Sequence, residues 1–270
     1  MNKSFNQNRS GSGTREWSDR SYNIAHGCSH GCLYCYARSF KARFDADVRQ
    51  PGGWENQRLR AGSSLGSDVR GAGVVMFPTA HDLTPAILPE TVATIQNLLA
   101  GGNDLLIVAK PHLEVIKRLC DEFAGDRERI LFRFSIGTLN AGLCEYWEPS
   151  APAPEERLQS LEHAFDSGFA TSVSMEPMLD SVDATVELVA TVEPFVTDTI
   201  WIGKMQRIPQ KLNSHVLGFT EACVKIKAQQ RDEEILRLVD ALKGNEKVQW
   251  KDSIKKVIAR SVGQNSEEAI

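Results

Sequence analysis

The sequence lacks any run of 18 or more apolar residues, and its opening stretch, MNKSFNQNRSGSGT, lacks the apolar segment of a secretory signal. The first absence excludes a membrane-spanning helix, and the second excludes a secretory signal peptide. We therefore expect a cytoplasmic protein with no membrane contact, whose residues 1–14 are disordered. In a reducing compartment its six cysteines are not expected to form a disulfide framework.

The chain of 270 residues is 41% hydrophobic and 24% charged, which is enough to bury a sizeable core. Apolar, β-branched runs lie at 21–25, 74–78, 104–110, 130–137, 170–177 and 198–204. Each run is too short for a buried helix, and helical patterns follow them at 34–44, 88–101, 111–125, 153–168 and 181–192. This alternation predicts an α/β fold of six strands. We expect a partial (β/α)6 TIM-like barrel with mostly parallel strands, and a doubly wound sheet is the alternative.

The alternation occupies residues 15–204, which we predict to be the core. Within it, residues 45–73 are rich in glycine and have no apolar periodicity, so we expect a long loop beside the active site. Residues 205–270 are predicted to form a basic, mainly helical extension packed on this core. From residue 204 to residue 260 there are 13 Lys and Arg against 7 Asp and Glu, a charge of +6. The whole chain has a net charge of −4, so the residues outside this segment carry −10. This charge indicates either the solvated face of amphipathic helices or a surface for a polyanion or acidic partner.

Three cysteines, Cys28, Cys32 and Cys35, follow the first predicted strand and precede its helix. In parallel α/β folds the loops after the strands carry the chemistry. Thiolates at the spacing C-x3-C-x2-C can bind three corners of a cubane 4Fe-4S cluster, and Gly27 and Gly31 let the backbone approach it. The fourth iron would then keep an open position, as catalytic metal sites do for a substrate or cofactor.

A structural zinc site is the alternative, because His26 or His30 could complete a Cys3His tetrahedron. The remaining cysteines stand apart from one another and are typical of small buried apolar residues: Cys120, Cys144 and Cys223. Zinc would make the chain a non-enzymatic module for nucleic-acid recognition.

The stretch GCSHGCLYCYAR resembles the cluster motif of the radical SAM (S-adenosylmethionine) superfamily. The wider pattern SYNIAHGCSHGCLYCYAR, with the later YWEPSAPAPEERLQSLEHAFDSGFATSVSMEP, resembles the spore photoproduct lyase-like branch. The stretches EWSDRSYN, VMFPTAHDL, SMEPML and IWIGK resemble a phage-associated radical SAM-like family of poorly known function. Together these resemblances span residues 17–204.

The resemblance implies a cofactor site around the cysteines. In the branch, aromatic residues flanking the third cysteine help to seat SAM, and Tyr34 and Tyr36 hold those places here. A hydroxyl, a lysine and a serine follow the next strands in the branch, and Thr79, Lys110 and Ser135 match that order. An ammonium such as that of Lys110 could pair with the SAM carboxylate. Local packing, a solvated strand end or turn capping would explain the same residues.

Two carboxylates also follow apolar strands and recur in the phage-associated pattern. Glu176 is assigned to the cofactor site, and Asp82 has no assigned role. An N-cap or a structural ion pair would explain either.

The resemblance further implies an enzyme that reductively cleaves SAM at a 4Fe-4S cluster, giving a 5'-deoxyadenosyl radical that abstracts hydrogen from its substrate. An electron donor of flavodoxin or ferredoxin type is implied, because the chain holds one cluster motif. We expect a nucleobase, nucleotide or nucleic-acid substrate, with a small metabolite or peptide as the alternative. The chain departs from the lyase at Pro78, where the lyase has a hydrogen-donating cysteine, so Cys144 or a tyrosine would have to take that role.

Overall fold

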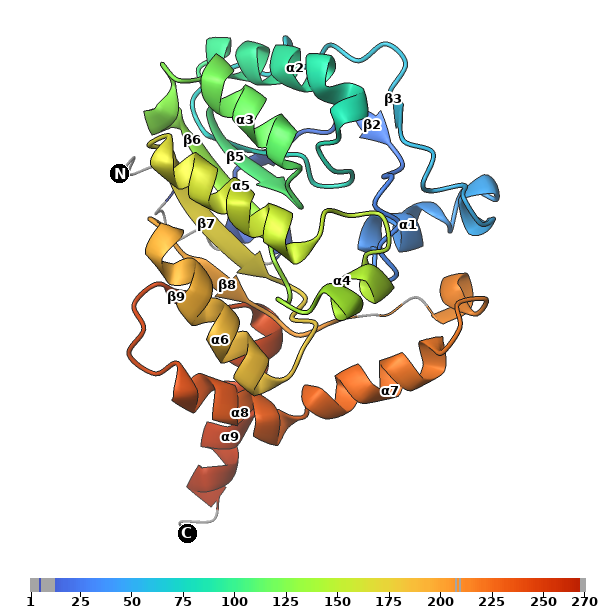
Figure 1. The fold of residues 1–270 in the computed structure, drawn as a ribbon, viewed down its shortest axis with the longest axis vertical. Coiled ribbons are helices and arrows are strands. Elements are labelled where there is room, and N and C mark those ends of the chain that lie inside the picture. Colours follow the sequence, from blue (N-terminus) through green and yellow to red (C-terminus); the bar gives the residue numbers. More distant parts are fainter. Residues whose placement is uncertain (1–4, 6–12, 207, 209, 268–270) are drawn as a thin grey trace.

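The computed structural model describes residues 5, 13–206, 208 and 210–267 (Figure 1). Most of the segment predicted to be disordered, residues 1–14, lies outside the described residues. None of the helices within these ranges is both long enough and apolar enough to span a bilayer.

A parallel sheet of seven strands forms the centre of the molecule, in the order β1-β4-β5-β6-β7-β8-β9. The strands are β1 (Arg20–Ser21), β4 (Val74–Phe77), β5 (Asp104–Ala109), β6 (Ile130–Ser135), β7 (Ala170–Met175), β8 (Ile200–Ile202) and β9 (Val248–Trp250). The predicted α/β class with mostly parallel strands is confirmed. The sheet has one strand more than expected, because the C-terminal extension contributes β9.

The first predicted strand, residues 21–25, is divided in the structure. Its start belongs to β1, whereas β2 (Ala25–His26) pairs antiparallel with β3 (Arg58–Leu59) in a separate ribbon. Between them the side chain of Asn23 accepts hydrogen bonds from the backbone N–H groups of Thr79 and Ala80. This side chain competes with the sheet ladder for backbone donors, which explains why an apolar pattern did not form one continuous strand.

Nine α-helices are present among the described residues. They are α1 (Tyr36–Lys41), α2 (Leu88–Ala100), α3 (Leu113–Glu122), α4 (Ala141–Trp147), α5 (Pro154–Asp166), α6 (Val182–Val192), α7 (Phe219–Gln229), α8 (Asp232–Ala241) and α9 (Asp252–Glu267). Short 3-10 helices lie at Gly13–Glu16, Asp47–Arg49, Pro85–Ile87, Arg127–Arg129, Glu193–Phe195 and Gln210–Asn213. The predicted helices all occur, and α4 was not predicted. It is a short helix whose start is capped by the side chain of Asn140, which accepts from the N–H of Leu143.

Helices α2, α3, α5 and α6 cover one face of the sheet (Figure 1). Alternate strand residues, such as Phe77, Ile107 and Phe132, are buried against these helices in one core. The intervening residues face the other side of the sheet. They are apolar near the strand starts, as at Leu106, and become polar toward the carboxyl ends, where Ser135 of β6 pairs in register with Ser174 of β7.

The C-terminal extension packs on this sheet through apolar side chains of α8 and α9, including Ile235 and Ile254. Several of its cations lie in ion pairs. Lys251 and Lys255 contact Glu16 at 2.5 and 3.0 Å, and Lys204 and Arg260 both contact Asp232. The observed packing favours the amphipathic-helix interpretation of the basic segment.

Replacement of Phe132 by Ala should strongly destabilise the fold. Its ring is fully buried between Phe134 and Phe169, at centroid distances of 5.6 and 5.2 Å. We expect a loss of about 3–5 kcal/mol in the free energy of unfolding, measured by urea denaturation. The matched control is Val224→Ala, whose side chain is 64% exposed and should change stability by less than about 0.5 kcal/mol. Equal losses in the two variants would contradict this assignment of the core.

Candidate active site

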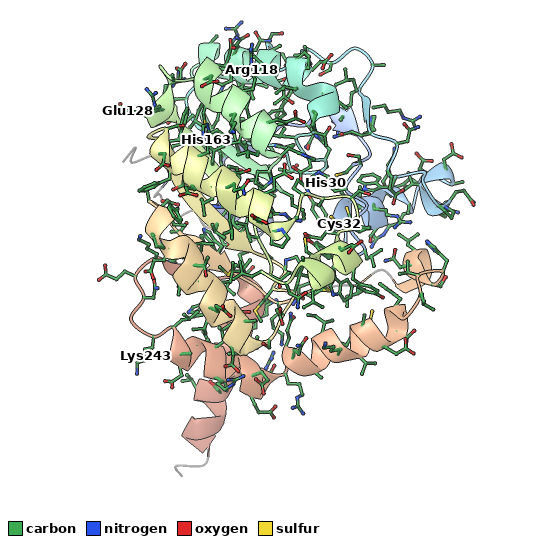
Figure 2. All side chains as sticks on the ribbon, viewed as in Figure 1. His30, Cys32, Arg118, Glu128, His163 and Lys243 are labelled. Atoms are coloured by element: carbon green, nitrogen blue, oxygen red, sulfur yellow. The ribbon has the colours of Figure 1, made fainter. Side chains whose placement is uncertain are left out.

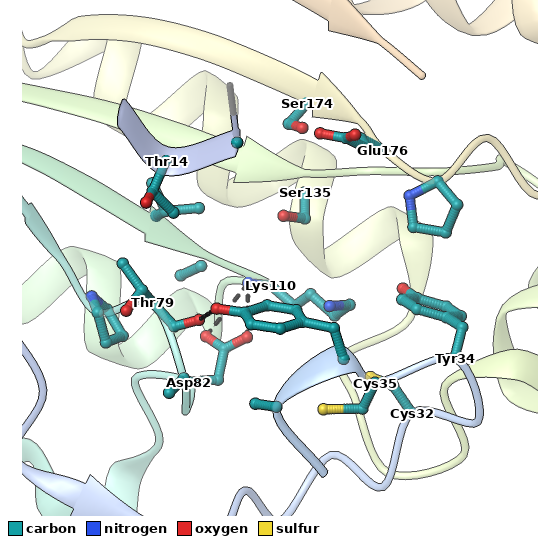
Figure 3. Close-up of a pocket in the computed structure, with 18 of the residues that line it drawn as sticks. Thr14, Cys32, Tyr34, Cys35, Thr79, Asp82, Lys110, Ser135, Ser174 and Glu176 are labelled. Carbon is teal, nitrogen blue, oxygen red and sulfur yellow. Dashed lines mark hydrogen bonds between the residues drawn. The ribbon is translucent and has the colours of Figure 1, made fainter. Parts of the chain in front are cut away.

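A cavity of about 640 Å³ opens at the carboxyl end of the sheet, on the face turned away from the helices (Figure 3). Every site residue expected from the sequence lines it: Cys28, Cys32, Tyr34, Cys35, Tyr36, Thr79, Asp82, Lys110, Ser135 and Glu176. Residues that were not singled out also line it, among them Thr14, Trp17, Ser174, Lys204 and Lys251. Its volume lies in the range of small-molecule and cofactor sites.

The cysteines lie on a tight loop between β2 and α1. The N–H of Cys28 donates to the carbonyl of Trp54 at 2.9 Å, so the loop is held from behind by residues of the 45–73 segment. Gly27 has a φ of +76°, and a Cβ at this position would lie 2.5 Å from the same carbonyl oxygen. A side chain at position 27 would therefore displace the loop.

The long segment 45–73 lies beside the cysteine loop, and none of its residues lines the cavity. Its Gln57 side chain donates to the carbonyl of Asp82 at 2.9 Å. The segment therefore supports the walls of the cavity instead of covering it.

The three thiols face a poorly solvated site. Burial raises the pKa of all three, for Cys28 to about 12, although Lys110 opposes the shift. Without a bound cation the thiols are therefore protonated at neutral pH. A bound metal would favour the thiolates and release these protons.

Thiols are the ligands that both iron–sulfur clusters and zinc take. Within the described ranges, no three His, Cys, Asp or Glu side chains are arranged so that they could hold one metal ion. A cubane cluster places each thiolate on a different iron, so its sulfur ligands do not have to surround one point.

The histidines that could complete a zinc site have other positions or partners. His30 lies close to Cys32 in the chain (Figure 2), but its Nδ1 is 3.2 Å from Asp82 and its Nε2 is 3.0 Å from His112. His26 lies on β2 with an exposed side chain. One ring nitrogen of His30 would have to leave its partner before the residue could bind zinc.

Glu148 does not line the cavity but contacts two of the site residues, Tyr34 and Lys110. The hydroxyl of Tyr34 donates to its Oε1, and the Nζ of Lys110 lies 3.8 Å from the same oxygen. The guanidinium of Arg157 lies 2.5 Å from Oε2, and the Glu148 side chain is only 2% exposed. Burial raises the pKa of this carboxyl, but Arg157 and Lys110 outweigh it, so the net pKa is lowered and the group is ionised.

Glu148 and Arg157 were not predicted as site residues. The signal was present, because Glu148 is the glutamate of YWEPSAPAP, a stretch that carries the family resemblance. Its role depends on Lys110 and Tyr34, which are distant in the sequence, and spacing alone could not assign it.

Lys110 is a cation whose charge lowers the pKa of all three thiols, against the effect of burial. Burial lowers its pKa, but Cys32, Glu148 and Asp82 outweigh this effect, so the net pKa is raised and the ammonium is charged. Its Nζ lies 5.6 Å from the ring centroid of Tyr34. The charged end of the side chain therefore lies beside Glu148 and Tyr34 at the wall of the cavity.

Asp82 and Thr79 shape the wall on the side of β4 (Figure 3). Both carboxylate oxygens of Asp82 accept from the N–H of Lys110, at 3.2 and 3.1 Å. The hydroxyl oxygen of Thr79 accepts from the amide of Asn23 at 2.8 Å, and the hydroxyl of Tyr36 donates to the carbonyl of Thr79. Asp82 thus joins the loops after β4 and β5.

The opposite wall is formed by β6 and β7, where Ser135, Ser174 and Glu176 lie together (Figure 3). The carboxylate of Glu176 is 3.7 Å from the Nζ of Lys251. Burial raises the pKa of Glu176, while Lys251 opposes the shift. This wall presents hydroxyl and carboxyl groups at some distance from the cysteines. The period-two pattern along β7 contained the signal for Ser174.

Cys144 lies outside the cavity. It is buried on α4, with its Sγ 3.1 Å from Arg157. The suggestion that it donates hydrogen to a substrate radical therefore has no geometric support, whereas Tyr34 and Tyr36 both line the cavity.

Solved structures of spore photoproduct lyase share this fold. A cysteine-to-serine mutant superposes with a TM-score of 0.56 at 13% identity, covering 87% of this chain and 77% of the lyase. A double mutant with bound AdoMet and dinucleoside spore photoproduct gives 0.51 at 13% identity, covering 87% and 76%. The expected resemblance to this radical SAM branch is confirmed at the level of the fold.

A protein of Acidianus two-tailed virus, described as uncharacterized, is 28% identical over 166 residues. The match covers 58% of this chain and 54% of the viral protein, so the shared region is about half of that relative. No protein-family model matches the chain.

Removal of the Glu148 charge should unfold the site. Glu148→Gln leaves Arg157 buried without its carboxylate and removes one of the two carboxylate neighbours of Lys110, and we expect a loss of about 3–5 kcal/mol in the free energy of unfolding. The control is Glu122→Gln, which breaks the exposed pair with Arg118 at 2.8 Å and should cost less than about 0.5 kcal/mol. Urea denaturation of both variants is the measurement, and a loss below 1 kcal/mol in Glu148→Gln would refute the buried-network assignment.

The same carboxyl should make stability depend on acid pH. Because its pKa is lowered in the folded state, its contribution is present above the ordinary value of 4.5 and is lost as the pH falls through the folded value. The difference in unfolding free energy between the wild type and Glu148→Gln should therefore shrink below about pH 4.5. Urea titrations across the acid range measure it, and a constant difference would contradict the lowered pKa.

Proposed function

We propose that this protein is a radical SAM enzyme that acts on a nucleobase or nucleotide, free or within a nucleic acid. The observation that carries the proposal is the convergence of all nine assigned cofactor-site residues, with Asp82, on one cavity at the carboxyl end of a parallel sheet. The fold shared with spore photoproduct lyase supports it.

Cys28, Cys32 and Cys35 would hold a 4Fe-4S cluster, and SAM would occupy the space between them and the ends of β4 to β7. When bound, the reduced cluster and SAM would supply a carbon-centred radical able to abstract hydrogen from a substrate. The ammonium of Lys110, held charged by its carboxylate neighbours, pairs with the SAM carboxylate. Tyr34 lies next to this ammonium, and Glu148 fixes both groups in place.

The remaining roles divide between the two walls. Tyr36 and Thr79 contact the adenosine part of SAM, where a ring face and a hydroxyl are useful. Ser135 and Glu176 line the other wall and complete the SAM site from the side of β6 and β7. Together these walls orient the reacting atoms and exclude water from them.

A nucleobase substrate is supported by the polar groups of that second wall. Ser174 and Glu176 accept or donate hydrogen bonds, and Lys251 donates them, which suits the adjacent N–H and C=O groups of a base. The double mutant of the lyase holds a dinucleoside together with AdoMet. Pro78 lines this cavity, and among the described residues its cysteines are the three assigned to the cluster. The proposed reaction would therefore use a hydrogen donor other than the cysteine expected for the lyase. An external electron donor of flavodoxin or ferredoxin type completes the system.

The cluster assignment predicts that Cys32→Ala abolishes SAM cleavage. After anaerobic reconstitution with iron and sulfide, the wild type should be brown and form 5'-deoxyadenosine from SAM and dithionite. Cys32→Ala should lose at least about 1.4 kcal/mol of transition-state stabilisation, a tenfold or greater fall in rate.

The control is Cys223→Ala, a buried cysteine of α7 outside the cavity, which should keep both colour and activity. A colourless zinc protein that leaves SAM intact would overturn the proposal in favour of a structural clip.

A further inference from the structure

A second hollow of about 360 Å³ lies beside the cavity, on the outer side of α1. We call it the α1 groove and define it by six of its lining residues, Tyr36, Phe40, Lys41, Trp54, Arg58 and Arg60. Its lining residues include members of α1 and of the ribbon of β2 and β3, which are labelled in Figure 1. None of the roles proposed above uses it.

The α1 groove adjoins the cavity. Tyr36, Ala37 and Ala80 line both hollows, so Tyr36 stands at the boundary between them. A molecule with one unit in the cavity can place its next unit in the groove. This favours a chain-like occupant with repeating units.

Aromatic rings are available at the groove. The side chains of Tyr36 and Phe40 are 64% and 59% exposed, which is unusual for rings of this size. They are one helical turn apart, a rise of about 6 Å along α1. Trp54 forms part of the wall, and its indole N–H has no hydrogen-bond partner among the described residues. The groove thus offers ring faces for stacking.

Positive charge surrounds the rings. Arg58 and Lys41 line the groove with Arg60, and the guanidinium of Arg43 lies 6.0 Å from the Phe40 ring centroid. One carboxylate, Asp45, also lines it and is 3.8 Å from Lys41. The surplus at the groove is therefore cationic.

We propose that the α1 groove binds the nucleotide next to the reacting one, so that the substrate is a single-stranded nucleic acid and not a free nucleoside. Stacking on Phe40 and phosphate contacts from Arg58 and Arg60 are the interactions by which proteins hold single strands. An acidic redox protein would meet the same charge, but it would present a broad surface, whereas the groove is a hollow that adjoins the cavity. The inference rests on the proposed function.

The test measures binding of a fluorescein-labelled oligothymidylate to the full-length protein by anisotropy, across a salt titration. Phe40→Ala should weaken binding roughly tenfold, and Phe40→Trp should restore it, because stacking is regained. The plot of the logarithm of the association constant against the logarithm of the salt concentration has a negative slope. Arg58→Ala should make this slope less steep by about 0.7, because one phosphate contact is lost. Thymidine 5'-phosphate should bind more weakly than the oligonucleotide to the wild type and should not respond to Phe40→Ala.

Two matched controls lie away from α1. Arg118→Ala removes one positive charge on α3 (Figure 2), and Phe165→Ala removes a partly exposed ring on α5. Neither should change oligonucleotide binding. The inference is overturned if Phe40→Ala and Arg58→Ala bind the oligonucleotide as the controls do, or if the two variants instead lose only the binding of a flavodoxin.

The failure of this inference is distinct from the failure of the proposed chemistry. Formation of 5'-deoxyadenosine with dithionite needs no nucleic acid, so it reports on the cluster and SAM alone. A protein that cleaves SAM but ignores the oligonucleotide overturns the α1 groove only. One that binds the oligonucleotide through Phe40 and Arg58 but leaves SAM intact supports the groove and overturns the chemistry.

Discussion

The two faces of the seven-stranded sheet impose the main constraint on this molecule. Alternate residues of each strand must be buried against the helices, because they form the largest apolar core. The remaining residues face the other side of the sheet, where residues at the strand ends do not have to pack against the helices. Ser135, Ser174 and Glu176 can therefore be polar, and the parallel direction of the strands brings them to one edge.

A network of buried charged groups fixes the positions of several side chains at this edge of the sheet. Glu148 contacts Lys110, Tyr34 and Arg157, which come from three different segments of the chain. Because a buried carboxylate is costly without partners, each of these groups limits where the others can lie. The cysteine loop is positioned separately, through the backbone of Trp54 and the left-handed conformation of Gly27.

Charge is used differently in the two basic regions of the protein. In the C-terminal extension, Lys251, Lys255 and Arg260 are taken up by Glu16 and Asp232, and they help to fasten α9 to the core. At the α1 groove the cations Arg58 and Arg60 surround exposed rings instead. The ion pairs of the extension favour the interpretation of its charge as the solvated side of amphipathic helices.

The sequence by itself determined the features that depend on local spacing. The alternation of short apolar runs and amphipathic helices specifies the parallel α/β class, and the C-x3-C-x2-C spacing places three thiols on one loop, because neighbours in the chain remain neighbours in space. Only the tertiary structure decided which distant residues meet. The addition of β9 to the sheet, the contact of Glu148 with Lys110 and the position of the α1 groove beside the cavity all join segments far apart in the chain. Such contacts follow from the packing of the whole core, which no local pattern encodes.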